Sequence, residues 1–312
     1  AALLACLLAA GPARAEFTGA DAGTSGANFL KLGVGARAVA MGGAVTASVA
    51  DPTAMRWNPA GLAAVTRYTV STMHSSHLGV ADYEYVGAAL PSPALGGVLG
   101  VDLTYLSAGV ISRTDASGNE QGSFKPYNMA FGLGYARPLG PLRLGAAGRF
   151  IQTKIVNSAS TFALDAGAQY RFNNFLRFGG SVHNLGPGLK FRQERDPLPL
   201  LVRAGSAMVL STDCLFELDL SFPRDNQPAL HAGVDYRLHR GDKLWLMGRL
   251  GYSSQALHVR GFAGPSFGLG LSWSRTFALD YSLSPTGELG LSHMASLKFS
   301  WGSPVSMEQA EK

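Results

Sequence analysis

The sequence predicts an all-β fold, a transmembrane antiparallel β-barrel of fourteen strands preceded by a short helical or irregular segment. Three observations lead there: charged residues are only 15% of the chain, Gly accounts for 39 of 312 residues, and polarity alternates from about residue 67 onward. That charge is well below the level typical of a soluble domain. Alternation with period two gives a strand one apolar and one polar face. No apolar run after the N-terminus is long enough for a membrane-spanning helix.

The alternation is clearest in residues 160–172, 214–222, 229–238 and 276–284. In the last of these, large apolar residues alternate with small or polar ones: Phe277, Leu279, Tyr281 and Leu283 with Ala278, Asp280, Ser282 and Ser284. A soluble sandwich would also alternate, but here the apolar face often ends in aromatic residues. Aromatic girdles of this kind mark the two interfaces of a membrane barrel. A closed barrel also satisfies every backbone group in lipid.

Taken in order, fourteen segments are expected to be strands, an even number as in single-chain bacterial barrels. They are 67–76, 82–91, 95–107, 127–138, 142–156, 160–172, 176–184, 199–210, 214–222, 229–238, 244–252, 265–273, 276–284 and 289–301. The longest gaps, 108–126, 185–198 and 253–264, are expected to be outer loops. The barrel is therefore expected over residues 67–301, and a polar tail over 302–312 follows it.

Charged residues of both signs lie on the polar face of these segments, beside many glycines. The candidate lumen-lining residues are Asp102, Arg149, Asp165, Arg171, Arg203, Asp219, Asp235, Arg237, Arg249 and Asp280. Opposite charges inside a narrow barrel neutralise each other across strands. We therefore expect a lumen that is substantially plugged. The charges could have a structural role or could line a pathway, and the sequence does not decide between the two.

The first fifteen residues read as a signal peptide truncated at its start. An apolar run ends at Gly11-Pro12, and Ala13-Arg14-Ala15 then gives a small-x-small cleavage pattern. Cleavage would leave Cys214 as the single cysteine, so no internal disulfide is expected. A lipoprotein acylated at Cys6 is the alternative. Residues 16–66 are expected to form an N-terminal segment packed in or against the barrel.

Two motif blocks fall in residues 26–66, which do not alternate. The first runs from Gly35 to Ala47, and the second runs from Asp51 to Leu62. Asp51 can cap a short helix with Pro52 at its first position, and Pro59 and Gly61 are expected to end it. Asn58 could act as the cap that ends the helix or could contact a ligand, and the sequence leaves both roles possible. The candidate motif residues are Gly35, Arg37, Met41, Gly42, Gly43, Asp51, Trp57, Asn58, Pro59 and Gly61.

These blocks resemble the FadL-like outer-membrane β-barrels, and most closely the PorV/PorQ family, which carries a GARAxxMGGA-type block followed by a WNPAGL block. Weaker matches are Asn184-Leu185-Gly186-Pro187, Leu198-Pro199-Leu200, Asp235-Tyr236 and Asp280-Tyr281. The resemblance spans nearly the whole chain after residue 15. It implies a fourteen-strand barrel in the outer membrane of a Gram-negative-type bacterium, reached by export.

The resemblance implies a non-enzymatic protein with one of two roles. The first is an accessory barrel in protein secretion, with secretion-system or exported proteins as partners. The second is a FadL-type channel for hydrophobic small molecules such as long-chain fatty acids, with such a molecule as ligand. The polar composition of loop 111–126 favours protein contact, so secretion is the main prediction and the channel is the alternative. Outer-membrane lipid is a partner in both, and no basic block marks a nucleic-acid binder.

Other motifs are weaker. Gly33-x-Gly35-x-x-Ala38 matches a dinucleotide fingerprint, but Met41-Gly42-Gly43 interrupts the long helix that such a site needs. His74 and His77 offer two metal ligands without an acidic cluster nearby. No motif joins Ser, His and an acid into a hydrolase site. We therefore expect no cofactor, no metal and no catalytic residues.

Overall fold

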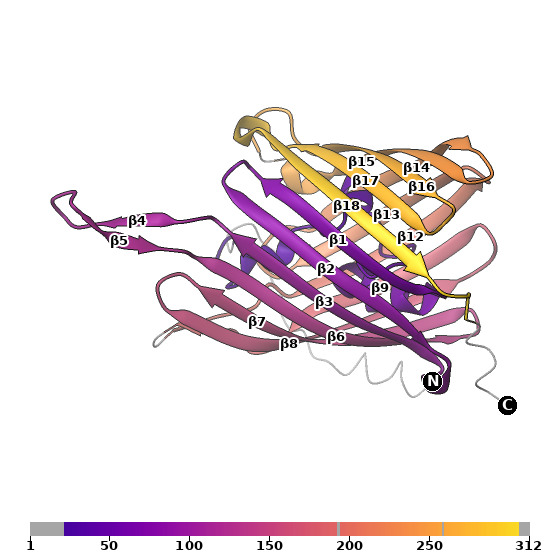
Figure 1. The fold of residues 1–312 in the computed structure, drawn as a ribbon, viewed down its shortest axis with the longest axis horizontal. Coiled ribbons are helices and arrows are strands. Elements are labelled where there is room, and N and C mark those ends of the chain that lie inside the picture. The colour runs from indigo at the N-terminus through magenta and orange to yellow at the C-terminus, as the bar shows by residue number, and fades with distance from the viewer. Residues whose placement is uncertain (1–21, 192–193, 258, 306–312) are drawn as a thin grey trace.

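The computed structural model describes residues 22–191, 194–257 and 259–305, and the predicted signal peptide lies outside them. Within those residues, fourteen strands close into one barrel in the order β1-β18-β17-β16-β15-β14-β13-β12-β9-β8-β7-β6-β3-β2 (Figure 1). The strands are β1 (Tyr68–His77), β2 (Ala81–Ser92), β3 (Gly97–Ser107), β6 (Tyr127–Leu139), β7 (Leu142–Lys154), β8 (Ser158–Arg171), β9 (Leu176–Leu185), β12 (Leu201–Ser211), β13 (Cys214–Pro223), β14 (Ala229–Arg240), β15 (Leu244–Ser253), β16 (Pro265–Trp273), β17 (Phe277–Pro285) and β18 (Leu291–Trp301).

The predicted fold class is confirmed. Every neighbouring pair of barrel strands is antiparallel, and β1 meets β18 to close the ring, with Tyr68 opposite Trp301 and Ser76 opposite His293. Each strand end lies within about two residues of its predicted position. The period-two pattern therefore located the barrel wall from local polarity alone.

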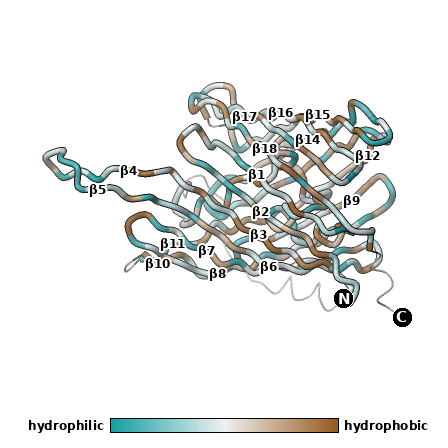
Figure 2. Tube along the Cα trace, viewed as in Figure 1, coloured by the Kyte–Doolittle hydropathy of each residue, from teal (hydrophilic) through white to brown (hydrophobic). Residues whose placement is uncertain are grey.

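The sequence did not predict two small hairpins outside the wall. One pairs β4 (Ile111–Thr114) with β5 (Glu120–Phe124), and the other pairs β10 (Leu189–Phe191) with β11 (Glu194–Asp196). The β4–β5 hairpin extends well beyond the barrel (Figure 1), and its tip is hydrophilic (Figure 2). Its strands are exposed almost throughout, so they have no buried face to impose an alternating pattern.

The two ends of the barrel differ. The connections over 108–126, 186–200 and 254–264 leave the same end, which we call the long-loop end. The opposite, short-turn end carries tight connections such as Gly140-Pro141 and Thr212-Asp213. The three gaps predicted to be loops thus lie together.

Side chains alternate between the outer face and the lumen as predicted. On β8, Phe162 and Leu164 are 65% and 64% exposed, whereas Asp165 between Leu164 and Ala166 is only 3% exposed. Aromatic rings of Tyr68, Phe299 and Trp301 stack on the outer face at the short-turn end. This arrangement suits a lipid-facing surface with an aromatic girdle. None of the described helices has the length and apolar character needed to cross a membrane.

Residues 26–66, which we call the plug, lie inside the barrel (Figure 1). Short helices form most of the plug: η2 (Asn28–Lys31), α2 (Ala36–Ala40), α3 (Ala54–Trp57) and η3 (Pro59–Ala64). Its buried apolar side chains include Met41, Val45, Met55 and Leu62, and they pack with small wall residues such as Ala147. Three further short helices occupy turns: η4 (Pro93–Leu95), η5 (Ser254–Ala256) and η6 (Gly287–Leu289).

The predicted ends of the first plug helix are only partly correct. Helix α3 ends at Trp57, just before Pro59, but Gly61 lies inside a second helix, η3, which begins at Pro59. At the other end the N-cap residue of α3 is Thr53, so Asp51 and Pro52 precede the helix. Asn58 ends α3 and also starts η3, because its Oδ1 accepts a hydrogen bond from the backbone N–H of Ala60 at 3.1 Å. Pro suits the first position of a helix, where its missing N–H costs nothing.

The abundance of glycine has a structural reason in the barrel wall. At several lumen-facing glycines an added Cβ would collide with the plug, chiefly with its backbone: Gly145, Gly179, Gly233, Gly251 and Gly268 are examples. Glycine leaves room for one backbone to lie directly against another. The wall is thus shaped to hold the plug.

Candidate functional site

Asp219 of β13 is the main anchor of the plug. Its carboxylate is fully buried and accepts hydrogen bonds from the backbone N–H groups of Val45 and Thr46, each at 3.0 Å, and from Thr46 Oγ1 at 2.6 Å. Arg203 Nη2 on neighbouring β12 lies 3.4 Å from the same carboxylate. A carboxylate that receives several charge-assisted bonds fixes the loop that donates them.

Arg203 links this anchor to the rest of the plug. Its Nε donates to Thr46 Oγ1 at 3.1 Å, and its Nη2 donates to the carbonyl oxygen of Gly43. The guanidinium also stacks on the ring of Trp57, 4.9 Å from the centroid. Arg203 is 6% exposed, so one side chain ties β12 to two separate parts of the plug.

A second chain of charges joins Arg37 of the plug to β13 and the strands that follow it around the wall. Arg37 Nε lies 3.1 Å from Asp235, and Arg249 Nε lies 3.2 Å from the same carboxylate. Arg249 Nη1 then reaches Asp280 at 2.6 Å. Arg37 Nη2 is also 3.8 Å from Glu217, which accepts from Ser48 Oγ. Opposite charges therefore neutralise each other across β13, β14, β15 and β17, as the sequence predicts.

A third charged group lies on the other side of the lumen. Arg149 Nη2 donates to Asp165 at 2.9 Å and to the carbonyl oxygen of Met55 at 2.9 Å, and its Nη1 is 3.6 Å from Asp102. All three charged side chains are almost completely buried. Arg149 thus connects β3 and β8 to the plug.

Ser181, His183 and Asp165 lie in a row that superficially resembles a hydrolase triad. Ser181 Oγ is 2.9 Å from His183 Nε2, and His183 Nδ1 is 3.6 Å from Asp165. However, both Ser181 and His183 hydrogen bond to the carbonyl oxygen of Trp57, at 3.1 and 3.0 Å. The row therefore holds the plug in place, and both Ser181 and His183 are buried.

Asn58 is buried at the centre of these contacts. Its Nδ2 donates to the carbonyl oxygens of Thr46 at 2.8 Å and Ala168 at 3.0 Å. Trp57 Nε1 donates to Val34 O at 2.7 Å. Gly61 is needed because a Cβ there would strike the carbonyl oxygen of Val49. Asn58 thus acts as a cap and as a bridge from plug to wall.

The other motif residues shape the plug backbone. Gly35 and Gly42 have φ of +84° and +67°, values that favour glycine. Gly35 N lies 3.1 Å from Met73 Sδ, and Gly42 N donates to Ser266 Oγ at 3.1 Å. Asp51 Oδ1 accepts from the N–H of Thr53 at 2.9 Å at the start of the α3 turn.

Two candidate lumen residues lie apart from the buried groups. Arg171 is exposed at the short-turn end of β8. Arg237 pairs with Asp213 at 3.0 Å near the same end and covers the ring of Trp245. Both face the lumen side by strand alternation, but neither contacts the plug.

Several residues outside the candidate set take part in holding the plug. Gln169 Nε2 donates to the carbonyl oxygens of Thr46 and Val49, and His231 Nδ1 lies 2.8 Å from Gly42 O. Lys31 pairs with Asp225 near the long-loop end. Gln169 and His231 could have been predicted from the sequence, because both occupy inward positions on strands. The plug partners Thr46 and Lys31 carry no such signal.

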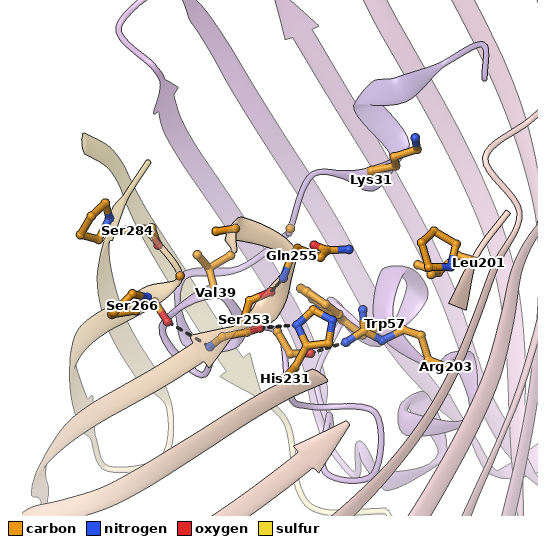
Figure 3. A pocket seen from close by; sticks show the side chains of 18 of the residues that line it. Lys31, Val39, Trp57, Leu201, Arg203, His231, Ser253, Gln255, Ser266 and Ser284 are labelled. Atoms are coloured by element: carbon orange, nitrogen blue, oxygen red, sulfur yellow. Dashed lines mark hydrogen bonds between the residues drawn. The ribbon is translucent and has the colours of Figure 1, made fainter. Parts of the chain in front are cut away.

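An outer cavity of about 280 Å³ opens near the long-loop end, above the plug. Figure 3 shows Val39, Trp57, Leu201, Arg203 and His231 around it. Four prolines complete much of the remaining wall: Pro199, Pro223, Pro265 and Pro285. The lining thus combines glycine and apolar side chains with polar and charged ones, among them Lys31, Arg203 and His231. Sites for small organic molecules usually combine an apolar lining with placed polar groups.

An inner cavity of about 370 Å³ lies toward the short-turn end. Its lining includes Arg37 of the plug, Trp245 and Met247 of β15, and Arg177 of β9. The Gly42–Gly43 backbone lines the outer cavity and Arg37 lines the inner one. The plug therefore separates the two.

Within the described part of the chain, no three His, Cys, Asp or Glu side chains come close enough to hold a metal ion. His74 instead pairs with Glu84 at 2.6 Å on the outer surface. The side chain of His77 is outside the described set.

No protein-family model matches the chain, and no curated protein matches its sequence. Solved structures do match its fold. The toluene transporter TodX of Pseudomonas putida aligns with a TM-score of 0.60 at 11% identity, over 86% of this chain and 98% of that one. The CymD monoaromatic hydrocarbon channel gives 0.58 at 12% identity, over 87% and 98%. A Pseudomonas aeruginosa FadL homologue gives 0.54 at 10% identity, over 83% and 95%.

The class that fold and lumen define is a closed fourteen-strand antiparallel barrel with an internal plug. Its fold is similar to the folds of the two hydrocarbon channels and the FadL homologue. None of these three bears on the PorV/PorQ resemblance of the N-terminal blocks. At these identities the likeness concerns the fold alone.

Proposed function

We propose that the protein is an outer-membrane channel for small hydrophobic molecules, with its long-loop end facing the outside and its short-turn end facing the periplasm. The outer cavity is the observation that carries this proposal. It lies at the end where a molecule from outside would arrive. This role is the alternative that the sequence left open.

The size of the outer cavity indicates the size of the molecule. Its volume is about 280 Å³, and a dry cavity of about 150 Å³ lined by apolar side chains already binds benzene. One single-ring aromatic or a short alkyl chain therefore fits. A long-chain fatty acid would have to extend out of the cavity.

The structural neighbours support the channel over the secretion role, because their names describe toluene and monoaromatic hydrocarbon transport. The hairpin β4–β5 is exposed and polar, as the secretion hypothesis expected of loop 111–126. Exposure of one hairpin does not single out a protein partner. The outer cavity supports a small hydrophobic ligand more directly, because Trp57, Leu201 and four prolines form much of its lining.

Passage through this channel requires the plug to move. The plug separates the outer and inner cavities, and charged side chains from several strands hold it. We therefore infer a closed resting state in which a hydrophobic molecule binds above the plug.

Filling the outer cavity tests the proposal. Leu201 of β12 lines the cavity, and Leu210 lies on the lipid-facing side of the same strand, 58% exposed. Leu201→Trp should block the cavity, whereas Leu210→Trp makes the same change facing lipid. Uptake of radiolabelled toluene is measured in a Gram-negative host that expresses each variant at equal level in its outer membrane.

Wild type and Leu210→Trp should accelerate uptake over the empty host, and Leu201→Trp should remove most of that gain. Equal uptake by Leu201→Trp and wild type, or no gain over the empty host, would contradict the channel.

A further inference from the structure

Three arginines cluster on the inner face at the short-turn end. Arg171 of β8 lies directly opposite Arg177 of β9, and Arg143 of β7 lies opposite Gln169, one step along the same face. Like charges placed directly opposite each other in a sheet are destabilising.

No acidic side chain in the described part of the chain pairs with this cluster. Arg143 donates to Gln169 Oε1 at 3.4 Å. Among the side chains that the structure describes, Arg171 and Arg177 have neither an ion pair nor a side-chain hydrogen bond. The rest of the lumen behaves differently, because its buried charges are paired. Arg177 thus differs from the buried arginines around the plug, which have carboxylate partners.

Arg177 also lines the inner cavity, and the acids of that cavity are already engaged. Asp213 pairs with Arg237 at 3.0 Å, and Asp280 pairs with Arg249 at 2.6 Å. The third, Asp235, lies between two arginines. Five cationic and three anionic side chains line this cavity. Two of the cations, Arg37 and Lys298, also have acid partners beyond the lining, Glu217 at 3.8 Å and Asp51 at 3.9 Å. Among the described residues, Arg177 is therefore the cation of this lining that has no ion pair.

The remaining lining of the inner cavity is largely apolar. Val209, Leu215, Trp245, Met247 and Ala278 contribute to it. A guest must therefore bring an apolar body as well as a negative charge. A carboxylate matches a guanidinium well, since two of its oxygens can accept two parallel N–H donors.

We propose that the inner cavity binds a hydrophobic carboxylate, an anionic group on a small aromatic or alkyl body, with Arg177 as its binding residue. The site follows from the unpaired arginines and the inner lining, so it does not depend on the channel role. It adds a charge preference at the periplasmic end to an outer cavity that is mostly apolar.

Quenching of Trp245 fluorescence by a heavy atom tests the site on the purified full chain. Trp245 lines the inner cavity. The probes are 4-bromobenzoate and its neutral counterpart 4-bromobenzyl alcohol. Because other tryptophans also emit, Trp245→Phe identifies the inner-cavity signal by difference. Arg177→Gln removes the binding charge, and Arg113→Gln is the control on the exposed β4 strand.

Saturable quenching by the carboxylate that disappears in Trp245→Phe is expected. The alcohol should bind at least about tenfold more weakly, because a hydrogen bond to a charged group contributes at least a factor of this size. Arg177→Gln should weaken the binding of the carboxylate to a similar degree, and Arg113→Gln should leave that binding unchanged. Equal binding of acid and alcohol, unchanged binding in Arg177→Gln, or quenching retained in Trp245→Phe would overturn the proposal.

The two proposals can fail separately. Leu201→Trp fills only the outer cavity, so it should leave the quenching of Trp245 intact. Loss of toluene uptake in Leu201→Trp without any carboxylate quenching in wild type would refute the inner site and keep the channel.

Discussion

Replacing Asp219 by Ala should release the plug from the wall. The substitution removes the acceptor of three hydrogen bonds from Val45 and Thr46, at 3.0, 3.0 and 2.6 Å, and the only carboxylate near Arg203 among the described residues. Breaking a buried charge pair costs about 3–5 kcal/mol. Arg203 keeps its bonds to the carbonyl of Gly43 and to Thr46 Oγ1, so we expect the lower end of that range.

A loss of about 3 kcal/mol shifts the docking equilibrium of the plug by roughly a hundredfold. Thiol labelling of Val45→Cys in a Cys214→Ser background reports this, because Val45 is completely buried when the plug is docked. When the plug redocks faster than the thiol reacts, the labelling rate is proportional to the undocked fraction of the protein. Asp219→Ala should then raise the labelling rate by about that factor. Planar-bilayer recordings should show little steady conductance for wild type and frequent openings for the variant.

The control is Asp213→Ala, which removes an ion pair to Arg237 at the more exposed short-turn end. Exposed pairs contribute about 0–1 kcal/mol, so labelling of Val45→Cys should change little. If Asp219→Ala labels no faster than Asp213→Ala, the carboxylate does not anchor the plug and the reasoning fails.

Three further outcomes are expected. Gly61→Ala should destabilise the folded protein by about 1–3 kcal/mol through overpacking, which lowers the midpoint temperature of heat-modified gel mobility. Gly148→Ala should leave that midpoint unchanged, because its added Cβ would meet only the side chain of Leu164 at 3.8 Å. Leu218→Arg in mid-strand should cost about 2–4 kcal/mol in denaturant titration, and Leu210→Arg at the strand end about 0–1 kcal/mol; equal costs would contradict the lipid-facing assignment. The pKa of Asp115 lies below its usual value because backbone N–H groups donate to its carboxylate, so amide protection in that turn should persist as pH falls through the ordinary aspartate range and disappear only through the lowered pKa.

The strands could be predicted because their signal is local. Each residue of a lipid-facing strand faces either hydrocarbon or the lumen. The polarity of Phe162 and Asp165 therefore indicates the side of the wall on which each lies, without reference to any distant residue. The charged candidates were assigned to the lumen side by the same reasoning. Alternation does not show how far along a strand the buried part extends, which is why exposed Arg171 could not be separated from buried Arg149.

The position of the plug could not be predicted in this way. It depends on pairs such as Val45 with Asp219 and Met55 with Arg149, which are far apart along the chain. Glycines of the wall also make room for the plug, and a glycine in the sequence does not show which segment will lie against it. The resemblance of the N-terminal blocks indicated that the segment matters, but no local pattern shows where it lies.

The seam between β1 and β18 also bears on how the protein folds. It joins Tyr68 to Trp301, nearly the two ends of the described wall, and contacts of such high sequence separation make folding slow. Until that seam forms, both strands present unpaired edges, which invite pairing with other chains. The plug precedes β1 and touches most of the wall, so we expect it to be enclosed while the last strand docks. A chain that lacks β18 should therefore aggregate before it reaches a membrane.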